Sequence, residues 1–175
     1  HYIGLFGATD AASIQNVGIM GGSITGNWVV GGLVGMNYNN ATIHSSYATA
    51  QVTSKGSFAG GLTGANSSGS RIENSYATGD VTAQSSNSNA GGLSGNNHTN
   101  SVIKNSYATG AVSGIERVGG LLGNNDSSTV ENSYATGQVT KTSGSAITFG
   151  GLVGWSGGTI KNSYWNSATT GQTQA

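Results

Sequence analysis

The sequence repeats one pattern about every 30 residues, and a period of this size restricts the fold to solenoids, propellers and similar arrays. One copy reads Gly-Gly-Leu-Thr-Gly from residue 60 and Arg-Ile-Glu-Asn-Ser-Tyr-Ala-Thr-Gly from residue 71. The first segment begins at Gly31, Gly60, Gly91, Gly119 and Gly150. The tyrosine of the second recurs at Tyr47, Tyr76, Tyr107, Tyr134 and Tyr164. With a degenerate copy before them, these segments predict about six units.

Three rows of apolar residues recur at fixed positions in the repeat. An isoleucine row comprises Ile14, Ile43, Ile72, Ile103, Val130 and Ile160. A leucine row comprises Leu33, Leu62, Leu93, Leu121 and Leu152, and a valine row comprises Val52, Val81, Val112 and Val139. Each row lies in a short segment rich in β-branched or aromatic residues and bounded by Gly, Asn or Ser, which is typical of strands. We predict an all-β fold: a parallel β-solenoid (β-helix) of about six coils, right- or left-handed, with three short strands per coil.

The residue after the isoleucine row alternates in charge along the chain. Its last four members are Glu73, Lys104, Glu131 and Lys161. In a parallel solenoid such residues stack about 4.8 Å apart, where opposite charges attract and like charges repel. The alternation therefore predicts in-register coils with this row facing solvent. It also predicts that Ser75 and Ala77 point outward and Tyr76 inward.

An asparagine row follows the charged row, at Asn74, Asn105, Asn132 and Asn162. We expect these side chains to face inward or to lie at a corner. There, stacked amides can hydrogen-bond to one another and to the backbone of the turn, so we assign the row a structural role.

We treat residues 1–175 as a single repeat domain. It divides into an irregular N-terminal coil at 1–30, regular coils at 31–154, and a C-terminal coil and cap at 155–175. Trp165 replaces the small residue that follows the tyrosine in other repeats, and we expect it to cover the end of the apolar core. The chain begins at His1, which suggests a mature segment or a piece of a longer protein.

The composition excludes several classes of partner. Charged residues make up 7% of the chain, and six basic and six acidic side chains give a net charge of zero. Nucleic-acid binding and binding to acidic membranes both require a basic excess. No apolar run approaches the roughly 20 residues of a membrane span, and the absence of cysteine excludes disulfides. A surface of Ser, Thr and Asn is what we expect of an extracellular protein.

The residues that usually carry catalysis or bind metals are scattered. The three histidines, His1, His44 and His98, have no second ligand at metal-site spacing. Glu73 and Glu131 share one row, but Lys104 lies between them and would neutralise both. We therefore expect no catalytic residue, no metal and no cofactor, and we predict that the chain is not an enzyme.

The segments Gly31-Gly32-Leu33-Val34-Gly35 and Asn74-Ser75-Tyr76-Ala77-Thr78-Gly79-Asp80-Val81 resemble the bacterial GLUG repeat. That repeat occurs in filamentous-haemagglutinin-like adhesins and in accessory regions of immunoglobulin-A metallopeptidases. The resemblance extends from about Tyr2 to Trp165. It implies a secreted or cell-surface bacterial protein with a repetitive β architecture, and it carries over no catalytic residue, because no His-Glu-x-x-His motif is present.

Two candidate binding surfaces follow from the pattern. The first is a flat face of small residues. It comprises an outward ladder at Ser46, Ser75, Ser106 and Ser133, a second ladder at Thr53, Thr82 and Thr140, and a third row at Thr49, Thr78, Thr109 and Thr136, whose direction near the glycine corner the pattern leaves open. The second consists of aromatic residues outside the rows and near loops, at Trp28, Tyr38 and Trp155. Such rings can stack on sugars or pack beneath a loop.

Two functions remain open. The first is a non-catalytic structural or adhesive module that holds its flat face and loops against a surface glycan or protein, with many weak contacts adding up. The alternative is an ice-binding (antifreeze) protein that uses the Thr, Ser and Ala ladders. End-to-end self-association is a further candidate interaction, because an open solenoid end exposes unpaired strands.

Overall fold

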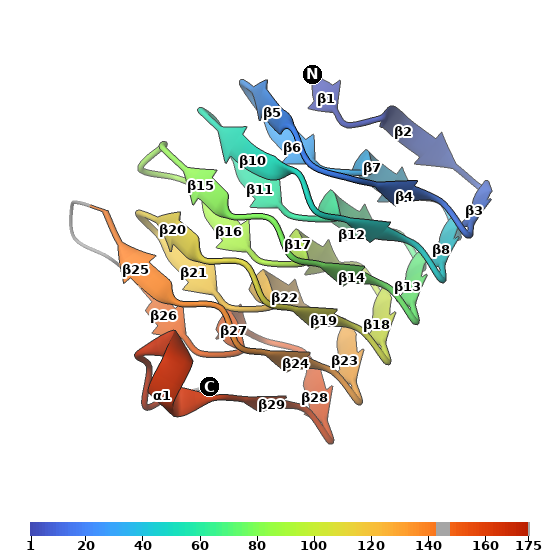
Figure 1. Cartoon of the computed structure of the whole chain (residues 1–175). Coiled ribbons are helices and arrows are strands. Elements are labelled where there is room, and N and C mark those ends of the chain that lie inside the picture. The colour runs from blue at the N-terminus through green and yellow to red at the C-terminus, as the bar shows by residue number, and fades with distance from the viewer. Residues whose placement is uncertain (143–147, 175) are drawn as a thin grey trace.

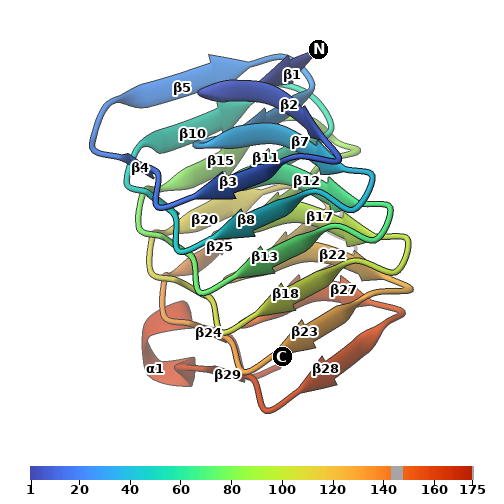
Figure 2. The ribbon, with the colours of Figure 1, turned by 90° about the vertical axis from the view of Figure 1, so that its right-hand side faces the viewer.

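The computed structural model describes residues 1–142 and 148–174. Figure 1 shows the chain winding into a solenoid whose coils follow one another from the N-terminus to helix α1 (Ser167–Thr170) near the C-terminus. Figure 2 shows the same solenoid turned by 90°, with equivalent strands of successive coils side by side. The strands pair in parallel within five sheets. The predicted all-β parallel β-solenoid is therefore confirmed.

Each sheet takes one strand from each successive coil. Sheet A contains β1 (Tyr2–Ile3), β6 (Val29–Gly31), β11 (Phe58–Gly60), β16 (Asn89–Gly91), β21 (Arg117–Gly119) and β26 (Thr148–Gly150). Sheet B contains β2 (Phe6–Asp10), β7 (Val34–Tyr38), β12 (Thr63–Ser67), β17 (Ser94–His98), β22 (Leu122–Asp126) and β27 (Val153–Ser156). Sheet C contains β3 (Ser13–Gln15), β8 (Thr42–His44), β13 (Arg71–Glu73), β18 (Val102–Lys104), β23 (Thr129–Glu131) and β28 (Thr159–Lys161).

The two remaining sheets complete each coil. Sheet D contains β4 (Gly18–Ile19), β9 (Tyr47–Ala48), β14 (Tyr76–Ala77), β19 (Tyr107–Ala108), β24 (Tyr134–Ala135) and β29 (Tyr164–Trp165). Sheet E contains β5 (Ser23–Gly26), β10 (Gln51–Ser54), β15 (Val81–Ala83), β20 (Val112–Gly114) and β25 (Val139–Lys141). In the described residues the solenoid thus has five complete coils and a sixth with four strands, close to the six predicted.

The predicted number of strands per coil is wrong, because each complete coil has five strands rather than three. The isoleucine and valine rows do lie in strands, in sheets C and E. The leucine row lies instead at the turn between sheets A and B, as Leu62 does between β11 and β12. The chain turns there, and the leucine side chain is buried in the core.

The core consists of two apolar clusters. The larger contains the leucine row, most of the isoleucine row and the alanines of sheet D, and the smaller contains the valine row with Val30, Ala59, Ala90 and Val118 of sheet A. Where opposite walls of the coil approach, Gly61 faces Ala77. A Cβ on Gly61 would lie 2.8 Å from the Ala77 Cβ and 2.1 Å from the carbonyl oxygen of Gly92 in the next coil. The second glycine of each Gly-Gly-Leu segment is therefore required by close packing.

The predicted facing of the Ser-Tyr-Ala segment is wrong. Ala77 is 0% exposed and Ser75 is 1% exposed, whereas Tyr76 is only half-buried. The cause is the preceding residue, because Asn74 has a φ of 50° and turns the corner between sheets C and D in the left-handed conformation. Two consecutive residues, Glu73 and Asn74, therefore face outward, and the inward–outward alternation shifts by one position.

The charged row stacks in register as predicted. Glu73 pairs with Lys104, Lys104 with Glu131, and Glu131 with Lys161 in adjacent strands of sheet C. The Lys104 ammonium lies 3.4 Å from a Glu131 carboxylate oxygen, while Glu73 forms its ion pair with Arg71 on its own strand. For the asparagine row the sequence analysis offered two placements, inward or at a corner. The row lies at the corner, and its side chains are exposed. There the amide of Asn105 donates to the Asn74 carbonyl at 3.1 Å.

A second amide ladder is fully buried, and the sequence analysis missed it. Its members are Asn37, Asn66, Asn97 and Asn125, each 0% exposed, near the ends of β7, β12, β17 and β22. The side-chain amides donate from one coil to the next, at 2.7 Å, 2.9 Å and 3.0 Å. Because several of these amides also donate to backbone carbonyls of the following turn, the ladder holds sheet B to sheet C.

The C-terminal coil is closed by the residues after β29. Trp165 packs against the larger core cluster, and its indole Nε1 donates to the Gln172 carbonyl at 3.0 Å. The Gln172 amide in turn donates to the carbonyl of Val139 in β25 at 3.1 Å. Of the described helices, none is long and apolar enough to cross a membrane.

Candidate functional site

The outer side of sheets D and E carries the most regular surface of the molecule, which we call the ladder face. We define it by three outward rows: Tyr47, Tyr76, Tyr107 and Tyr134; Thr49, Thr78, Thr109 and Thr136; and Thr53, Thr82, Ser113 and Thr140. The four tyrosine rings form one stack, with centroids 4.9–5.1 Å apart and planes within 5° of parallel. Stacking leaves ring edges and hydroxyls toward solvent, so the stack is a ridge rather than an open platform.

The tyrosine stack changes the acidity of Tyr107, one of its two inner members. Burial between neighbouring rings raises the pKa of Tyr107, and the adjacent Tyr134 and Tyr76 raise it further by charge repulsion. A phenolate at this position would be poorly solvated and close to two other phenols. Tyr107 is therefore neutral at physiological pH, and its hydroxyl acts as a hydrogen-bond donor and acceptor.

The serines predicted for the flat face are not on the surface. Ser46, Ser75, Ser106 and Ser133 are each 1% exposed, so their predicted outward direction is wrong. The hydroxyl of Ser75 donates to the Glu73 carbonyl at 2.8 Å and accepts the backbone N–H of Ser46 at 3.1 Å. Because this arrangement recurs from coil to coil, the serines satisfy backbone groups at the corner between sheets C and D.

The predicted threonines do lie outward, in two rows. Thr78 and Thr109 are exposed and Thr49 and Thr136 are half-buried, beside the tyrosine ridge. In sheet E, Thr53 pairs in register with Thr82, and Ser113 donates to the Thr82 hydroxyl at 3.1 Å. Asp80 and Lys141 lie among these rows and are exposed. The ladder face is therefore rich in hydroxyl groups but not free of charge.

The three aromatic residues predicted as loop contacts do not form one surface. Trp28, 60% exposed, lies between β5 and β6, and Tyr38 ends β7, where its hydroxyl donates to Asp10 at 3.0 Å. That hydrogen bond, with burial and the Asp10 charge adding to it, raises the pKa of Tyr38. Trp155 lies in the sixth coil, with the Arg117 guanidinium 5.3 Å from its ring centroid. Trp28 and Trp155 thus belong to opposite ends of the solenoid.

Trp28 borders an apolar groove of about 310 Å³ on the outer side of sheets A and B, lined by Tyr2, Trp28, Val29, Met36, Ser57, Phe58 and His98. Burial lowers the pKa of His98, and the charge of Asp126 opposes that shift. The imidazole is therefore mainly neutral near pH 7, and the groove offers aromatic surface with one polar ring. The sequence analysis singled out Trp28 but missed most of the lining. The other lining residues face outward from two different sheets, and only the bend between the sheets brings them close together.

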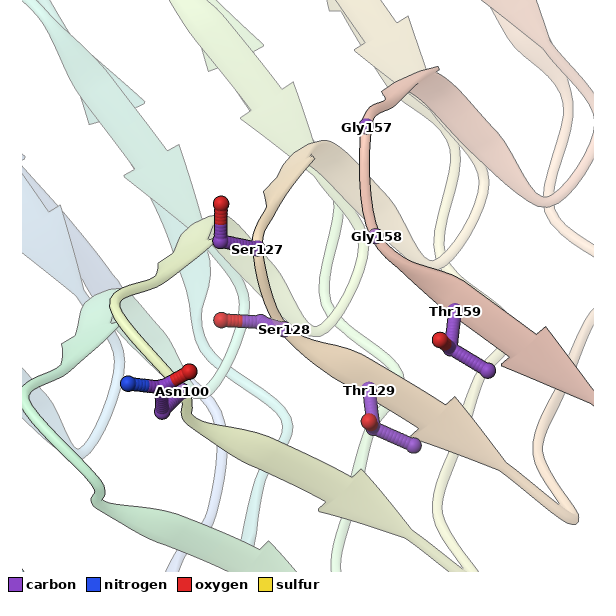
Figure 3. A pocket seen from close by; sticks show the side chains of 7 residues that line it. All are labelled: Asn100, Ser127, Ser128, Thr129, Gly157, Gly158 and Thr159. Carbon is purple, nitrogen blue, oxygen red and sulfur yellow. The ribbon is translucent and has the colours of Figure 1, made fainter.

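A second depression, of about 460 Å³, lies at the turns between sheets B and C in the last three coils (Figure 3). Its lining consists of Asn100, Ser127, Ser128, Thr129, Gly157, Gly158 and Thr159. Gly157 and Gly158 carry no side chains, whereas the equivalent positions of the two preceding coils have Asn or Ser. The lining has no titratable side chain, so this depression can offer neutral hydrogen-bonding groups only.

The described residues contain no group of three or more His, Cys, Asp or Glu side chains that could hold a metal ion. Glu73 and Glu131, the two carboxylates of one row, each have a cationic neighbour, Arg71 and Lys104 respectively. Both carboxylates are thus accounted for by ion pairs on the surface of sheet C.

Comparison with known proteins agrees with this architecture. The profile of the GLUG motif matches four successive segments, residues 26–53, 56–82, 86–113 and 114–140. A solved structure of a putative immunoglobulin A1 protease from Bacteroides ovatus superposes on 87% of this chain with a TM-score of 0.77 and 28% sequence identity. This chain spans about half of that protein, 51% of its length. No curated protein matches the chain. The four motif matches cover more than half of the sequence. They confirm the resemblance inferred from the Gly-Gly-Leu and Asn-Ser-Tyr-Ala-Thr-Gly segments. The chain therefore belongs to the GLUG motif family.

Proposed function

We propose that this chain is a non-catalytic structural and adhesive module of a secreted or cell-surface bacterial protein. The observation that carries the proposal is the ladder face, where tyrosine and threonine rows repeat in register over four or five coils. A rigid surface with equivalent groups about 4.8 Å apart suits a partner that is itself extended or repetitive, because each coil contributes the same weak contact.

The similarity to the Bacteroides ovatus protein supports the surface location and the accessory role. That protein is described as a putative immunoglobulin A1 protease, and this chain resembles about half of it. We propose that the solenoid of this chain likewise serves as a spacer and binding module beside other parts of a longer protein. The partner is a surface glycan or a surface protein.

A binding assay with two matched sets of variants tests this function. The chain is immobilised and exposed to glycan panels, extracellular-matrix proteins and whole cells. Thr78→Arg with Thr109→Arg places two bulky cations on the ladder face, whereas Ser13→Arg with Thr42→Arg places two on the outer side of sheet C, away from every depression described above. We expect at least one partner, with binding reduced about tenfold or more by the first pair only. Equal losses in both pairs, or no partner at all, would overturn the proposal.

Ice binding is the second candidate. The observation in its favour is the in-register threonine row of sheet E, in which Thr25, Thr53 and Thr82 are paired. Against it, the tyrosine ridge and the exposed Asp80 interrupt the flat lattice of small groups that this function requires. Thermal hysteresis and recrystallisation assays of the chain and of Thr82→Tyr decide between the two. Activity that the bulky residue abolishes would place ice binding first.

A further inference from the structure

The tyrosine stack ends with one ring face that no other ring covers. Tyr76 and Tyr107 are enclosed by a ring on each side, and Tyr47 lies so close above Gly18 that a Cβ there would overlap the ring. Tyr134 stacks on Tyr107 on one side only. In the described part of the chain, Tyr164 of the next coil makes no stacked pair with it, although their backbones are paired in register.

Trp165 explains why the stack stops there. The repeat places alanine after the tyrosine, but the sixth coil has Trp165, which pairs with Ala135 and packs its indole inward against Gly151. Tyr164 is 67% exposed and Tyr134 is 43% exposed, while Tyr76 within the stack is half-buried. A slot of about 330 Å³ opens between the two coils, lined by Tyr134, Ala135, Thr136, Tyr164, Trp165 and Asn166.

The slot combines an apolar interior with polar groups that can form further hydrogen bonds. Within the described residues, the Thr136 hydroxyl makes no hydrogen bond. Asn166 uses its side-chain carbonyl to cap helix α1 at the Ala168 N–H, 3.0 Å away, and its NH2 group has no partner in the same residues. No charged side chain lines the slot. It therefore suits a flat, neutral ring with an apolar face and a polar edge.

We propose that this slot binds one pyranose ring of a neutral glycan. The C–H face of the sugar lies on the open face of Tyr134, in the position that the next tyrosine ring of the stack would occupy, and its hydroxyls meet Thr136 and Asn166. An aromatic side chain would fill the same space but would bury these two polar groups without partners, which is costly. The inference rests on the proposed adhesive function and narrows its partner to a glycan.

Saturation-transfer NMR with the methyl glycosides of glucose, galactose, mannose and N-acetylglucosamine tests the site. We expect transfer to ring C–H protons of at least one glycoside, with a dissociation constant on the order of millimolar. Tyr134→Leu should weaken binding about tenfold or more, and Thr136→Val, which keeps the shape of the side chain, should weaken it severalfold. The matched control is Phe6→Leu, which removes an exposed aromatic ring from the first coil, outside the ladder face and the slot, and should change binding less than twofold.

Three results would overturn the inference: no transfer to any glycoside, equal losses in Tyr134→Leu and Phe6→Leu, or tighter binding of p-cresol or 3-methylindole than of every glycoside. The last would identify an aromatic side chain as the occupant. Including Tyr134→Leu in the cell and glycan-panel assay separates this inference from the proposed function. If Tyr134→Leu still binds in the cell and glycan-panel assay, the slot is not the glycan site, whereas the proposed adhesive function is unaffected.

Discussion

The buried amide ladder gives the sharpest prediction about stability. Asn97 is fully buried, accepts from the Asn66 amide at 2.9 Å and donates to the Asn125 carbonyl at 3.0 Å. In Asn97→Ala both hydrogen bonds are lost. Asn66 keeps a second acceptor, the Ser70 carbonyl at 3.1 Å, but the Asn125 carbonyl loses its donor. Two net hydrogen bonds at about 1 kcal/mol each and one unsatisfied buried acceptor at about 1–3 kcal/mol predict a loss of about 3–5 kcal/mol.

The exposed amide ladder at the corner supplies the matched control. Asn105 also makes two amide hydrogen bonds, to Asn74 at 3.1 Å and from Asn132 at 3.2 Å, but water can replace them. Its φ of 49° suits glycine, so Asn105→Gly removes the amide without straining the backbone. We expect this variant to lose at most about 1 kcal/mol.

Equilibrium urea unfolding followed by tryptophan fluorescence and by circular dichroism measures both free energies. Coincident transitions from the two probes are needed before the values are compared, because the coils of a repeat protein can unfold separately. A loss below about 1 kcal/mol in Asn97→Ala, or equal losses in the two variants, would refute the argument that burial makes the amide ladder stabilising.

Three further predictions concern other features of the solenoid. Gly92→Ala places a Cβ 2.2 Å from the Gly120 carbonyl oxygen and 2.7 Å from the Ala108 Cβ, so we expect a loss of about 2 kcal/mol or more, seen as a lower melting temperature. The raised pKa of Tyr107 means that the folded state holds the phenol proton more tightly than the unfolded state. The stability gained from this difference is present below about pH 10 and is lost as pH rises through the folded pKa. The free energy of unfolding, measured from about pH 9 to 11, should therefore decline less in Tyr107→Phe than in the unchanged chain. Lys104→Ala removes a partly exposed ion pair with Glu131 and should cost at most about 1 kcal/mol, less at high salt.

The sequence was sufficient for the architecture because each coil depends on the same few positions. Periodicity of the isoleucine and valine rows predicted parallel stacking, and the alternating charges from Glu73 to Lys161 predicted the register that the strands adopt. The direction of Ser75, Tyr76 and Ala77 was not predictable from alternation alone. It depends on the left-handed conformation of Asn74, and nothing in a strand pattern shows that one residue will turn a corner.

The candidate surfaces were harder to predict for a different reason. Outward threonines such as Thr78 follow from the repeat, but grooves form where different sheets or different coils meet. The signal for the buried amide ladder was in the sequence, since Asn37, Asn66, Asn97 and Asn125 recur at the repeat spacing. The sequence analysis did not single out this row, whose burial depends on the bend between sheets B and C.

The departures from the repeat are therefore the best guide to binding. Residues that recur from the second coil onward, such as the serines of the Ser-Tyr-Ala segment and the glycines facing sheet D, are explained by packing or by backbone hydrogen bonds. Trp165, Asn166 and Ser167 replace the Ala-Thr-Gly of the repeat, and at this place the stack of rings ends and Tyr134 lines a slot. A repetitive ladder face provides many equivalent weak contacts, whereas a single slot at its end can select one ring. Under the two proposals above, the ladder face would hold an extended partner along its length and the slot would recognise one unit of it.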